Sequence, residues 1–216
     1  MGSPSTEFEE LRQKAESHLV STGSAQEVKA YVMMLAETAL PLTTKYQHID
    51  TKTLLLENTA GQNREEALDS LGKMVKALNV LEKYGCNLTN PTRPKYWRIV
   101  KHNNPIFRST VDAMKRGRDV LHLYGYTTQL PDGLSYPDEV TEPDIRRVAA
   151  VAIEVMVFRA ELDLLVKGSH PHSRFFESIL PFLGQQKHET EGAGITSDAV
   201  IFPSTKTEET KSEPPA

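Results

Sequence analysis

The sequence predicts a mostly α-helical protein with a few short β-strands. Two observations lead to this expectation. Apolar residues recur every three or four positions through most of the first 184 residues, as in amphipathic helices that pack on a core. The segments 96–100 and 131–137 instead combine β-favouring and turn-forming residues. With 216 residues, 38% of them hydrophobic, the chain is long enough for one domain with a substantial core.

The first helical region spans residues 6–47 and is expected to break once. Apolar residues follow helical spacing through its first half, and the sequence Ser-Thr-Gly-Ser then interrupts the pattern. Ser24, with Glu27 three positions later, predicts a capping box at the start of the second helix. Pro41 is expected to end or kink that helix, and a short helical turn is expected at 54–56.

A long helix is expected to begin at Asn63. Asparagine is a favoured N-cap, and Glu65 and Glu66 in the first turn interact favourably with the helix dipole. One apolar face follows, formed by Leu68, Leu71, Val75, Leu78 and Leu81. Tyr84 is the expected last residue, because Gly85 has the character of a glycine just past a helix end.

The middle of the chain predicts a turn, a strand and a helix in that order. The turn is at 90–94, where two prolines and an asparagine gather, and the strand is at 96–100. Asn104 followed by Pro105 predicts a helix start, and Gly125 follows the expected end of that helix. Its apolar residues are Phe107, Val111, Met114, Val120 and Leu121.

The last part of the chain changes from helical to polar character. The segment 131–137 predicts a turn with a short strand, and 141–144 predicts a helix start. That helix is expected to reach about Val166, and a last helix is expected at 175–183. Residues 185–216 lack apolar periodicity and are expected to be a disordered polar tail.

Composition argues against several classes of function. The net charge of −4 and the pI near 6.0 argue against a nucleic-acid partner. The start of the chain has no apolar leader, and the most apolar run, 148–158, is too short to span a membrane and contains Glu154. A single cysteine, Cys86, fits a reducing compartment, so we expect a cytoplasmic protein without disulfides, metal or cofactor.

The stretch from Tyr84 to Val111 differs from the rest of this acidic chain. It holds five Lys or Arg residues and no Asp or Glu, together with aromatic and amide side chains. The helix start expected at Asn104 should offer free N–H groups and a positive partial charge to a carboxylate. Asparagines suit a phenolic hydroxyl or a peptide backbone. These features predict a pocket for an acidic peptide that contains a tyrosine. The candidate residues are Tyr84, Asn87, Tyr96, Lys101, Asn103, Asn104, Pro105 and Ile106.

Other interpretations of the same residues stay open on the sequence alone. Asn104 also fits a plain N-cap, and the cations also fit a solvated surface. Cys86 with His102 suggests a thiol enzyme, although no third orienting residue or oxyanion motif is apparent. The segment 93–98 has the composition of an RNA-contact patch, without a surrounding RNA-binding motif.

Three segments, 76–88, 93–111 and 117–126, carry a resemblance to a known family. In them the chain resembles the PUB domain, the peptide-binding module of peptide N-glycanase, UBX-containing proteins and a ubiquitin ligase. The form it resembles most belongs to the catalytic subunit of the linear ubiquitin chain assembly complex. The resemblance runs roughly over 63–167, and the first sixty residues fit the extra helices of that form more loosely.

The resemblance implies a mostly α, PUB-type helical bundle with a small antiparallel β-sheet, an α+β fold. It implies binding of a short acidic motif with a central tyrosine or other aromatic residue, at the candidate residues named above. The partners it implies are the PUB-interacting motif of the deubiquitinase OTULIN, the C-terminal tail of valosin-containing protein, and the spermatogenesis-associated adaptor of the deubiquitinase CYLD. A monomer is expected.

The resemblance also implies how the chain is divided. Residues 1–62 would be a helical extension packed on the PUB core, 63–184 the core with a trailing helix, and 185–216 the tail. A ligase of this type needs a cysteine-rich RING-between-RING region, which one cysteine cannot build. The chain is therefore expected to be a non-catalytic fragment or short form.

Overall fold

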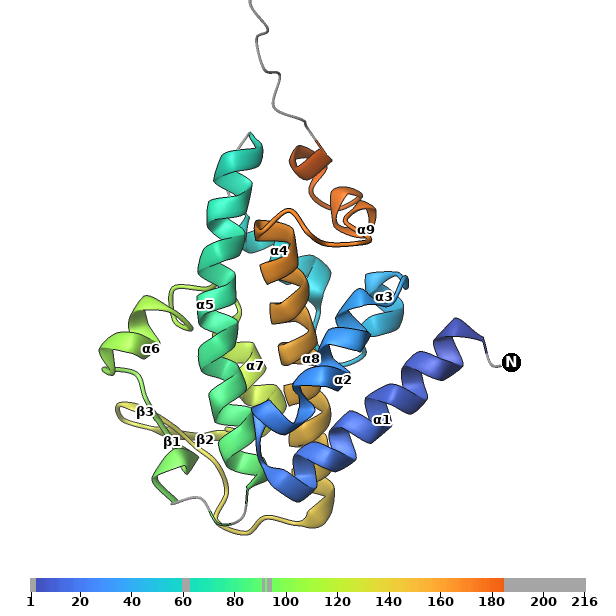
Figure 1. Cartoon of the computed structure of the whole chain (residues 1–216). Helices are drawn as coiled ribbons and strands as arrows, with labels where there is room; N and C mark the ends of the chain where they lie inside the picture. Colours follow the sequence, from blue (N-terminus) through green and yellow to red (C-terminus); the bar gives the residue numbers. More distant parts are fainter. Residues whose placement is uncertain (1–2, 60–62, 91, 93–94, 185–216) are drawn as a thin grey trace, which may run out of the picture. The chain divides into compact units, whose positions relative to one another are not determined.

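The computed structural model shows a mostly helical fold with one small antiparallel sheet, as predicted (Figure 1). It describes residues 3–59, 63–90, 92 and 95–184, so the predicted tail lies outside the described residues. The α-helices are α1 (Pro4–Thr22), α2 (Ala25–Glu37), α3 (Leu42–Lys45), α4 (Thr51–Asn58), α5 (Arg64–Thr89), α6 (Pro105–Ser109), α7 (Gly117–Tyr124), α8 (Glu142–Val166) and α9 (Arg174–Glu177). The described residues also form the 3-10 helices η1 (Lys95–Arg98) and η2 (Pro181–Gly184) and the strands β1 (Ile99–Lys101), β2 (Thr128–Leu130) and β3 (Gly133–Ser135).

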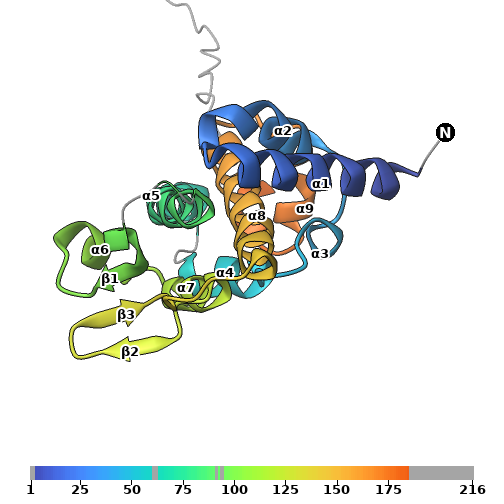
Figure 2. The same ribbon diagram turned by 90° about the horizontal axis from the view of Figure 1, so that it is seen from below.

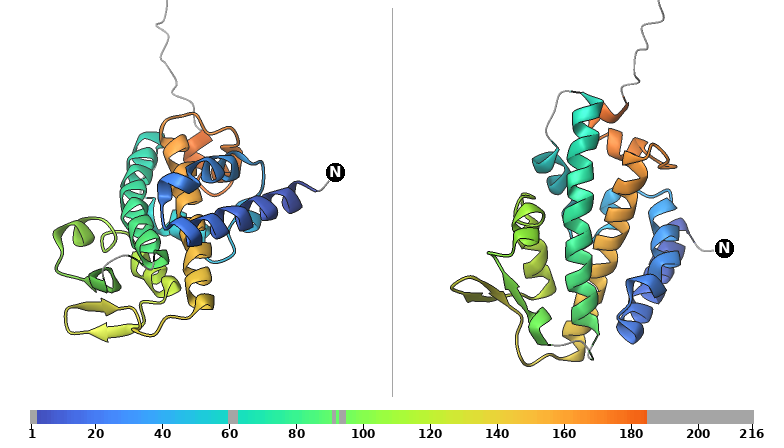
Figure 3. Two further views of the ribbon diagram at one scale, coloured as in Figure 1. Left: turned by 60° about the horizontal axis from the view of Figure 1, so that its bottom comes forward. Right: turned by 60° about the vertical axis from the view of Figure 1, so that its left-hand side comes forward.

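The two longest helices, α5 and α8, lie side by side and run in opposite directions (Figures 1 and 3). Every residue from Val151 to Phe158 is buried, so α8 is enclosed on all sides. This helix is covered by α5 on one side and by α1 and α2 on another (Figure 2). Apart from Glu154, the side chains of this buried stretch are apolar. The sheet and α6 lie on the other side of α5, away from α1 and α2 (Figure 2).

The helix starts at Asn63 and Thr141 are confirmed. The Asn63 side chain accepts a hydrogen bond from the Glu66 N–H, and Thr141 and Asp144 form a reciprocal capping box. The capping box predicted at Ser24 is wrong. Ser24 is the N-cap of α2, but its side chain makes no capping hydrogen bond, so the sequence pattern alone does not determine the side-chain geometry.

The predicted helix end at Tyr84 is also wrong, because α5 continues through Gly85 to Thr89. Gly85 serves close packing instead. A Cβ atom at this position would lie 2.7 Å from Ala152 Cβ and 2.9 Å from the Tyr124 hydroxyl oxygen. The missing side chain therefore lets α5 approach α8 and α7 closely, which a sequence pattern cannot distinguish from a helix end.

The strand predicted at 96–100 begins later than expected. Lys95–Arg98 form the 3-10 helix η1, and β1 follows at Ile99. The sheet order is β1-β3-β2, both pairs are antiparallel, and Val100 pairs with Leu134. Both of these side chains are buried, so this face of the sheet joins the core.

The single helix predicted after Asn104 is wrong, because α6 ends at Ser109 and α7 begins only at Gly117. Arg116 has a φ of 63°, in the left-handed region, where a helix cannot continue. A Cβ at Gly117 would lie 2.0 Å from the Val111 carbonyl oxygen, so only glycine fits this contact. Tertiary packing thus divides a segment whose apolar spacing is continuous.

Of the last two predicted helices, the first is confirmed at its end and the second is divided. α8 ends at Val166 as expected, but the segment 175–183 forms two short pieces, α9 and η2, instead of one helix. Phe176 and Leu183 are buried and hold these pieces on the core.

Candidate functional site

The candidate residues lie on α5, η1, β1, the loop that follows β1 and the first turn of α6. An aromatic cluster joins α5 to η1 and to Tyr126, which follows α7. The Tyr84 ring contacts the rings of Trp97 and Tyr126 edge-on, with centroids 6.0 and 5.9 Å apart. The Tyr126 hydroxyl donates a hydrogen bond of 2.7 Å to the Trp97 carbonyl oxygen. Burial raises the pKa of Tyr84 and of Tyr126, so both phenols stay neutral at physiological pH.

Asn104 is the N-cap of α6, as the plain interpretation had it. Its side-chain oxygen accepts hydrogen bonds from the N–H groups of Ile106 (2.9 Å) and Phe107 (3.1 Å). Arg108 N–H donates to the Asn104 carbonyl oxygen, and Pro105 has no N–H. The expectation of free N–H groups for a carboxylate is therefore wrong at this helix, whose first turn uses its donors internally.

The capping geometry determines what Asn104 can still offer. Its side-chain oxygen is occupied by two N–H donors, but its exposed Nδ2 amide keeps its hydrogens for a ligand. Asn87, on α5, has the opposite arrangement, since its Nδ2 donates 2.7 Å to the Lys83 carbonyl oxygen. Its Oδ1 can accept a hydrogen bond from a hydroxyl or an N–H group.

The segment 101–106, which runs from the end of β1 through a loop into the first turn of α6, is largely exposed. Lys101, Asn103, Asn104 and Pro105 are exposed, and Ile106 reaches 64% exposure, which is high for an isoleucine. Among the residues that the structure describes, Lys101 has no acidic partner. The segment therefore presents donors, one cation and an apolar side chain within six consecutive residues.

The other candidates differ in burial. Tyr84 is half-buried against the aromatic cluster, and Asn87 lies one turn further along α5. Tyr96 belongs to η1, but its side chain lies outside the described part of the structure. Phe107, expected in the core, is buried as predicted.

Sequence reasoning missed a structural role for His102. Its backbone N–H donates 2.8 Å to the Asp132 carbonyl oxygen, which ties the loop to the β2–β3 turn. Its ring stacks on Phe107, with centroids 5.8 Å apart and planes at 20°. These contacts fix the loop in front of Asn104. The buried Nε2 of His102 has no hydrogen-bond partner, and Cys86 is only 8% exposed, so the geometry does not favour a reactive thiol pair.

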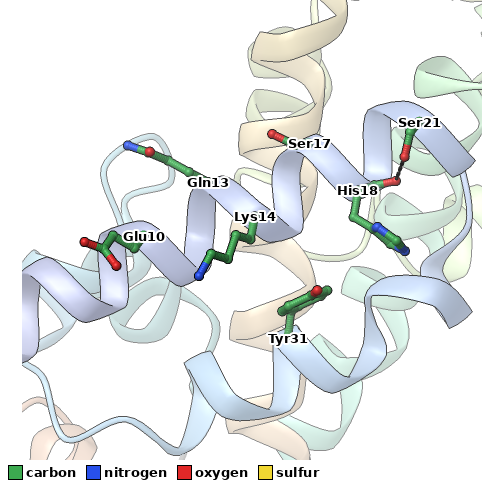
Figure 4. Close-up of a pocket in the computed structure, with 7 residues that line it drawn as sticks. All are labelled: Glu10, Gln13, Lys14, Ser17, His18, Ser21 and Tyr31. Atoms are coloured by element: carbon green, nitrogen blue, oxygen red, sulfur yellow. Dashed lines mark hydrogen bonds between the residues drawn. The ribbon is translucent and has the colours of Figure 1, made fainter.

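Two of the hollows on the described surface lie elsewhere, and no candidate residue lines either of them. Figure 4 shows the larger, about 610 Å³, where one polar face of α1 lies above Tyr31 of α2. A groove of about 440 Å³ runs between α2 and α8. The predicted peptide site thus lies on a different part of the surface from these hollows.

Comparison with known proteins identifies the central region. The model of the PUB domain family matches residues 71–150, a span that contains every candidate site residue. This chain contains a PUB domain. The human E3 ubiquitin-protein ligase RNF31 is 49% identical over 146 residues, which make up 68% of this chain and 13% of that protein. The mouse E3 ubiquitin-protein ligase RNF31 is 48% identical over 149 residues, 69% of this chain and 14% of that protein.

The matched region belongs to the N-terminal region of these relatives. The chain covers only a small part of their length. The PUB domain is a non-catalytic interaction domain, and it is the domain that the comparisons find in this chain. None of the described helices has both the length and the apolar character that crossing a membrane requires. The chain carries a protein-interaction module, and the two relatives that share it are named as E3 ubiquitin-protein ligases.

Proposed function

We propose that this PUB domain binds short acidic segments with a central tyrosine, at the surface formed by Tyr84, Asn87, Tyr96 and residues 101–106. The observation that carries the proposal is the free amide nitrogen of Asn104 close in sequence to Lys101, which has no acidic partner among the described residues, in a segment that His102 and Phe107 hold in place. A rigid exposed donor next to a cation is suited to a peptide carbonyl and a neighbouring carboxylate.

The two asparagines would have different roles. Asn104 Nδ2 would donate to a carbonyl or carboxylate oxygen of the motif, because its oxygen is already occupied. Asn87 Oδ1 would accept from the tyrosine hydroxyl or from a peptide N–H, while the bond from one of its two amide hydrogens to the Lys83 carbonyl oxygen holds the side chain in place. A tyrosine ring would cover part of Ile106 and contact Tyr84, so that one aromatic anchor carries much of the affinity.

The partners that the family implies fit this chemistry. We assign to the site the PUB-interacting motif of OTULIN, the C-terminal tail of valosin-containing protein and the spermatogenesis-associated adaptor of CYLD. The relatives are named as E3 ubiquitin-protein ligases. On this hypothesis the module brings deubiquitinases or an AAA ATPase to a linear-ubiquitin ligase and performs no chemistry itself.

The test is isothermal titration calorimetry with an acidic, tyrosine-containing peptide. Wild type is expected to bind with a Kd in the micromolar range or tighter, about −8 kcal/mol or better. Asn104→Asp keeps the oxygen that caps α6 but removes the free donor and adds a negative charge beside the acidic ligand. Binding should weaken by roughly 1–3 kcal/mol, or about five- to 150-fold, while the helix cap is retained.

Asn63→Asp is the matched control. Asn63 caps α5 in the same way, so this change adds the same charge at an equivalent cap outside the site. Its affinity for the peptide should stay at the wild-type value. Equal affinity of wild type and Asn104→Asp would contradict the assignment of Asn104, and no binding by folded wild type would contradict the function.

A further inference from the structure

The outward face of the small sheet carries an unusual apolar side chain next to Lys101. Side chains alternate along β1, so Ile99 and Lys101 share the exposed face while Val100 points into the core. In the register, Ser135 pairs with Ile99 and Gly133 pairs with Lys101. On the other side of β3, Thr128 pairs with Ser135 and Leu130 pairs with Gly133. The side chains on this face are Ile99, Lys101, Thr128, Leu130 and Ser135.

Exposed large apolar side chains flank Lys101 on both sides along the chain. Ile99 is 44% exposed and Ile106 is 64% exposed. A single exposed isoleucine needs no explanation, but Ile99 shares the exposed face of β1 with Lys101, which has no acidic partner among the described residues, and Ile106 follows five positions later. The inward face needs neither of them, because Val100, Leu134 and Phe107 fill the core there.

We propose that this sheet face extends the peptide site and takes an apolar side chain of the ligand, two residues away from the acid that meets Lys101. The inference rests on the proposed function. Same-face side chains in an extended strand are about 6.6 Å apart, both in β1 and in an extended ligand. A ligand that runs along β1 with an acid over Lys101 therefore places its next same-side residue over Ile99. The partner is thus an acidic segment with a nearby aliphatic residue, not only an acidic segment with a tyrosine.

The experiment compares synthetic peptides by isothermal titration calorimetry with the whole chain. The parent has a central tyrosine and an aspartate at each end. Four derivatives extend the parent by two residues. Two end in Asp-Gly-Leu or Asp-Gly-Ser, and two begin with Leu-Gly-Asp or Ser-Gly-Asp, so that the added Leu or Ser lies two residues from a terminal aspartate. One of the two leucine derivatives is expected to bind about three- to tenfold tighter than its serine counterpart, because leucine is partly buried on Ile99.

Ile99→Thr should remove this difference and leave the affinity for the parent unchanged. Threonine keeps the β-branched shape that suits a strand, so the sheet is retained. Leu56→Gln removes another exposed apolar side chain, 52% exposed on α4, and should keep the full difference.

Two outcomes separate this inference from the proposed function. If leucine and serine derivatives bind wild type equally at both ends while the parent still depends on Asn104, the extension is overturned and the function stands. If the parent does not bind folded wild type, the function fails and the extension fails with it.

Discussion

Glu16 shows how one partly buried carboxylate can work against the fold. Its side chain is 23% exposed, its Oε1 atom lies 3.6 Å from Arg12 Nε, and that oxygen has no hydrogen-bond partner. Burial raises the pKa of Glu16 above its ordinary value, and the Arg12 charge opposes this only in part. The folded protein therefore binds this proton more tightly than the unfolded chain. The associated stability is fully present below the unfolded pKa and is lost as pH rises through the folded pKa.

Glu16→Gln is therefore expected to stabilise the protein at pH 7, because it removes a carboxylate whose charged form is disfavoured in the fold. The gain should vanish near about pH 3.5, where the carboxylate is protonated in both states. Arg12 keeps Glu9 and Glu154 as partners. Urea unfolding at both pH values measures the effect, with Glu10→Gln, an exposed position on the same helix, as the control. A Glu16→Gln gain of equal size at both pH values would rule out this explanation.

At the level of elements, the contact of α5 with α8 and α7 depends on a residue without a side chain. Gly85 lies in the helix, where alanine would be favoured over glycine by about 1 kcal/mol. The contacts oppose this, because a Cβ would lie 2.7 Å from Ala152 Cβ. Overpacking a tight core costs about 1–3 kcal/mol, so steric cost is the larger effect.

Gly85→Ala is expected to lower the free energy of unfolding by up to about 2 kcal/mol, after the helix-propensity gain is subtracted. Gly72 offers a matched control on the same helix, because nothing lies within 4 Å of a Cβ built there. Gly72→Ala should stabilise the protein by about 0.5–1 kcal/mol. Chemical unfolding of both variants decides the matter, and a stabilising Gly85→Ala would show that the α5–α8 contact can expand at no cost.

Comparison of the elements shows which features a sequence determines locally. The starts at Asn63 and Thr141 were predictable, because a cap and the groups it binds lie within three residues of each other. The helix end predicted before Gly85 and the single helix predicted across Gly117 were wrong. Both errors depend on close contacts, with Ala152 and with Val111, that form only in the folded protein. The same limit applies to the site. The segment and its residue types could be predicted, whereas the free half of each amide depends on hydrogen bonds that only the fold reveals.

At the level of the whole molecule, two buried carboxylates join α8 to the N-terminal helices. Glu154 and Glu161 are each 1% exposed and lie seven residues apart, on one face of α8. Glu161 forms an ion pair with the buried Lys45 and accepts a hydrogen bond from the Tyr46 hydroxyl. Burial and the Glu161 charge raise the pKa of Tyr46, so the tyrosine remains a donor.

Glu154 makes the more extensive contacts. It accepts hydrogen bonds from the backbone N–H groups of Gln47, His48 and Ile49, at 2.8 to 3.2 Å. Its Oε1 also lies 3.4 Å from Nη1 of Arg12, a residue that is itself buried. The segment before α4 therefore depends on a core helix to satisfy its backbone. We propose on this basis that residues 1–62 unfold together with the core and not as a separate unit.

Glu154→Ala tests this cooperativity, because it leaves three N–H groups and the Arg12 charge without their buried partner. The expected loss is about 3–5 kcal/mol of unfolding free energy. Trp97, the sole tryptophan, reports the core by fluorescence, and amide hydrogen exchange of α1 reports the extension. The free energy of unfolding should fall by the same amount in both measurements. Glu142→Ala removes an exposed glutamate paired with Arg146 at the start of α8 and should cost less than about 1 kcal/mol. If α1 were destabilised while the Trp97 transition stayed in place, the extension would be a separate unit docked on an independently stable core.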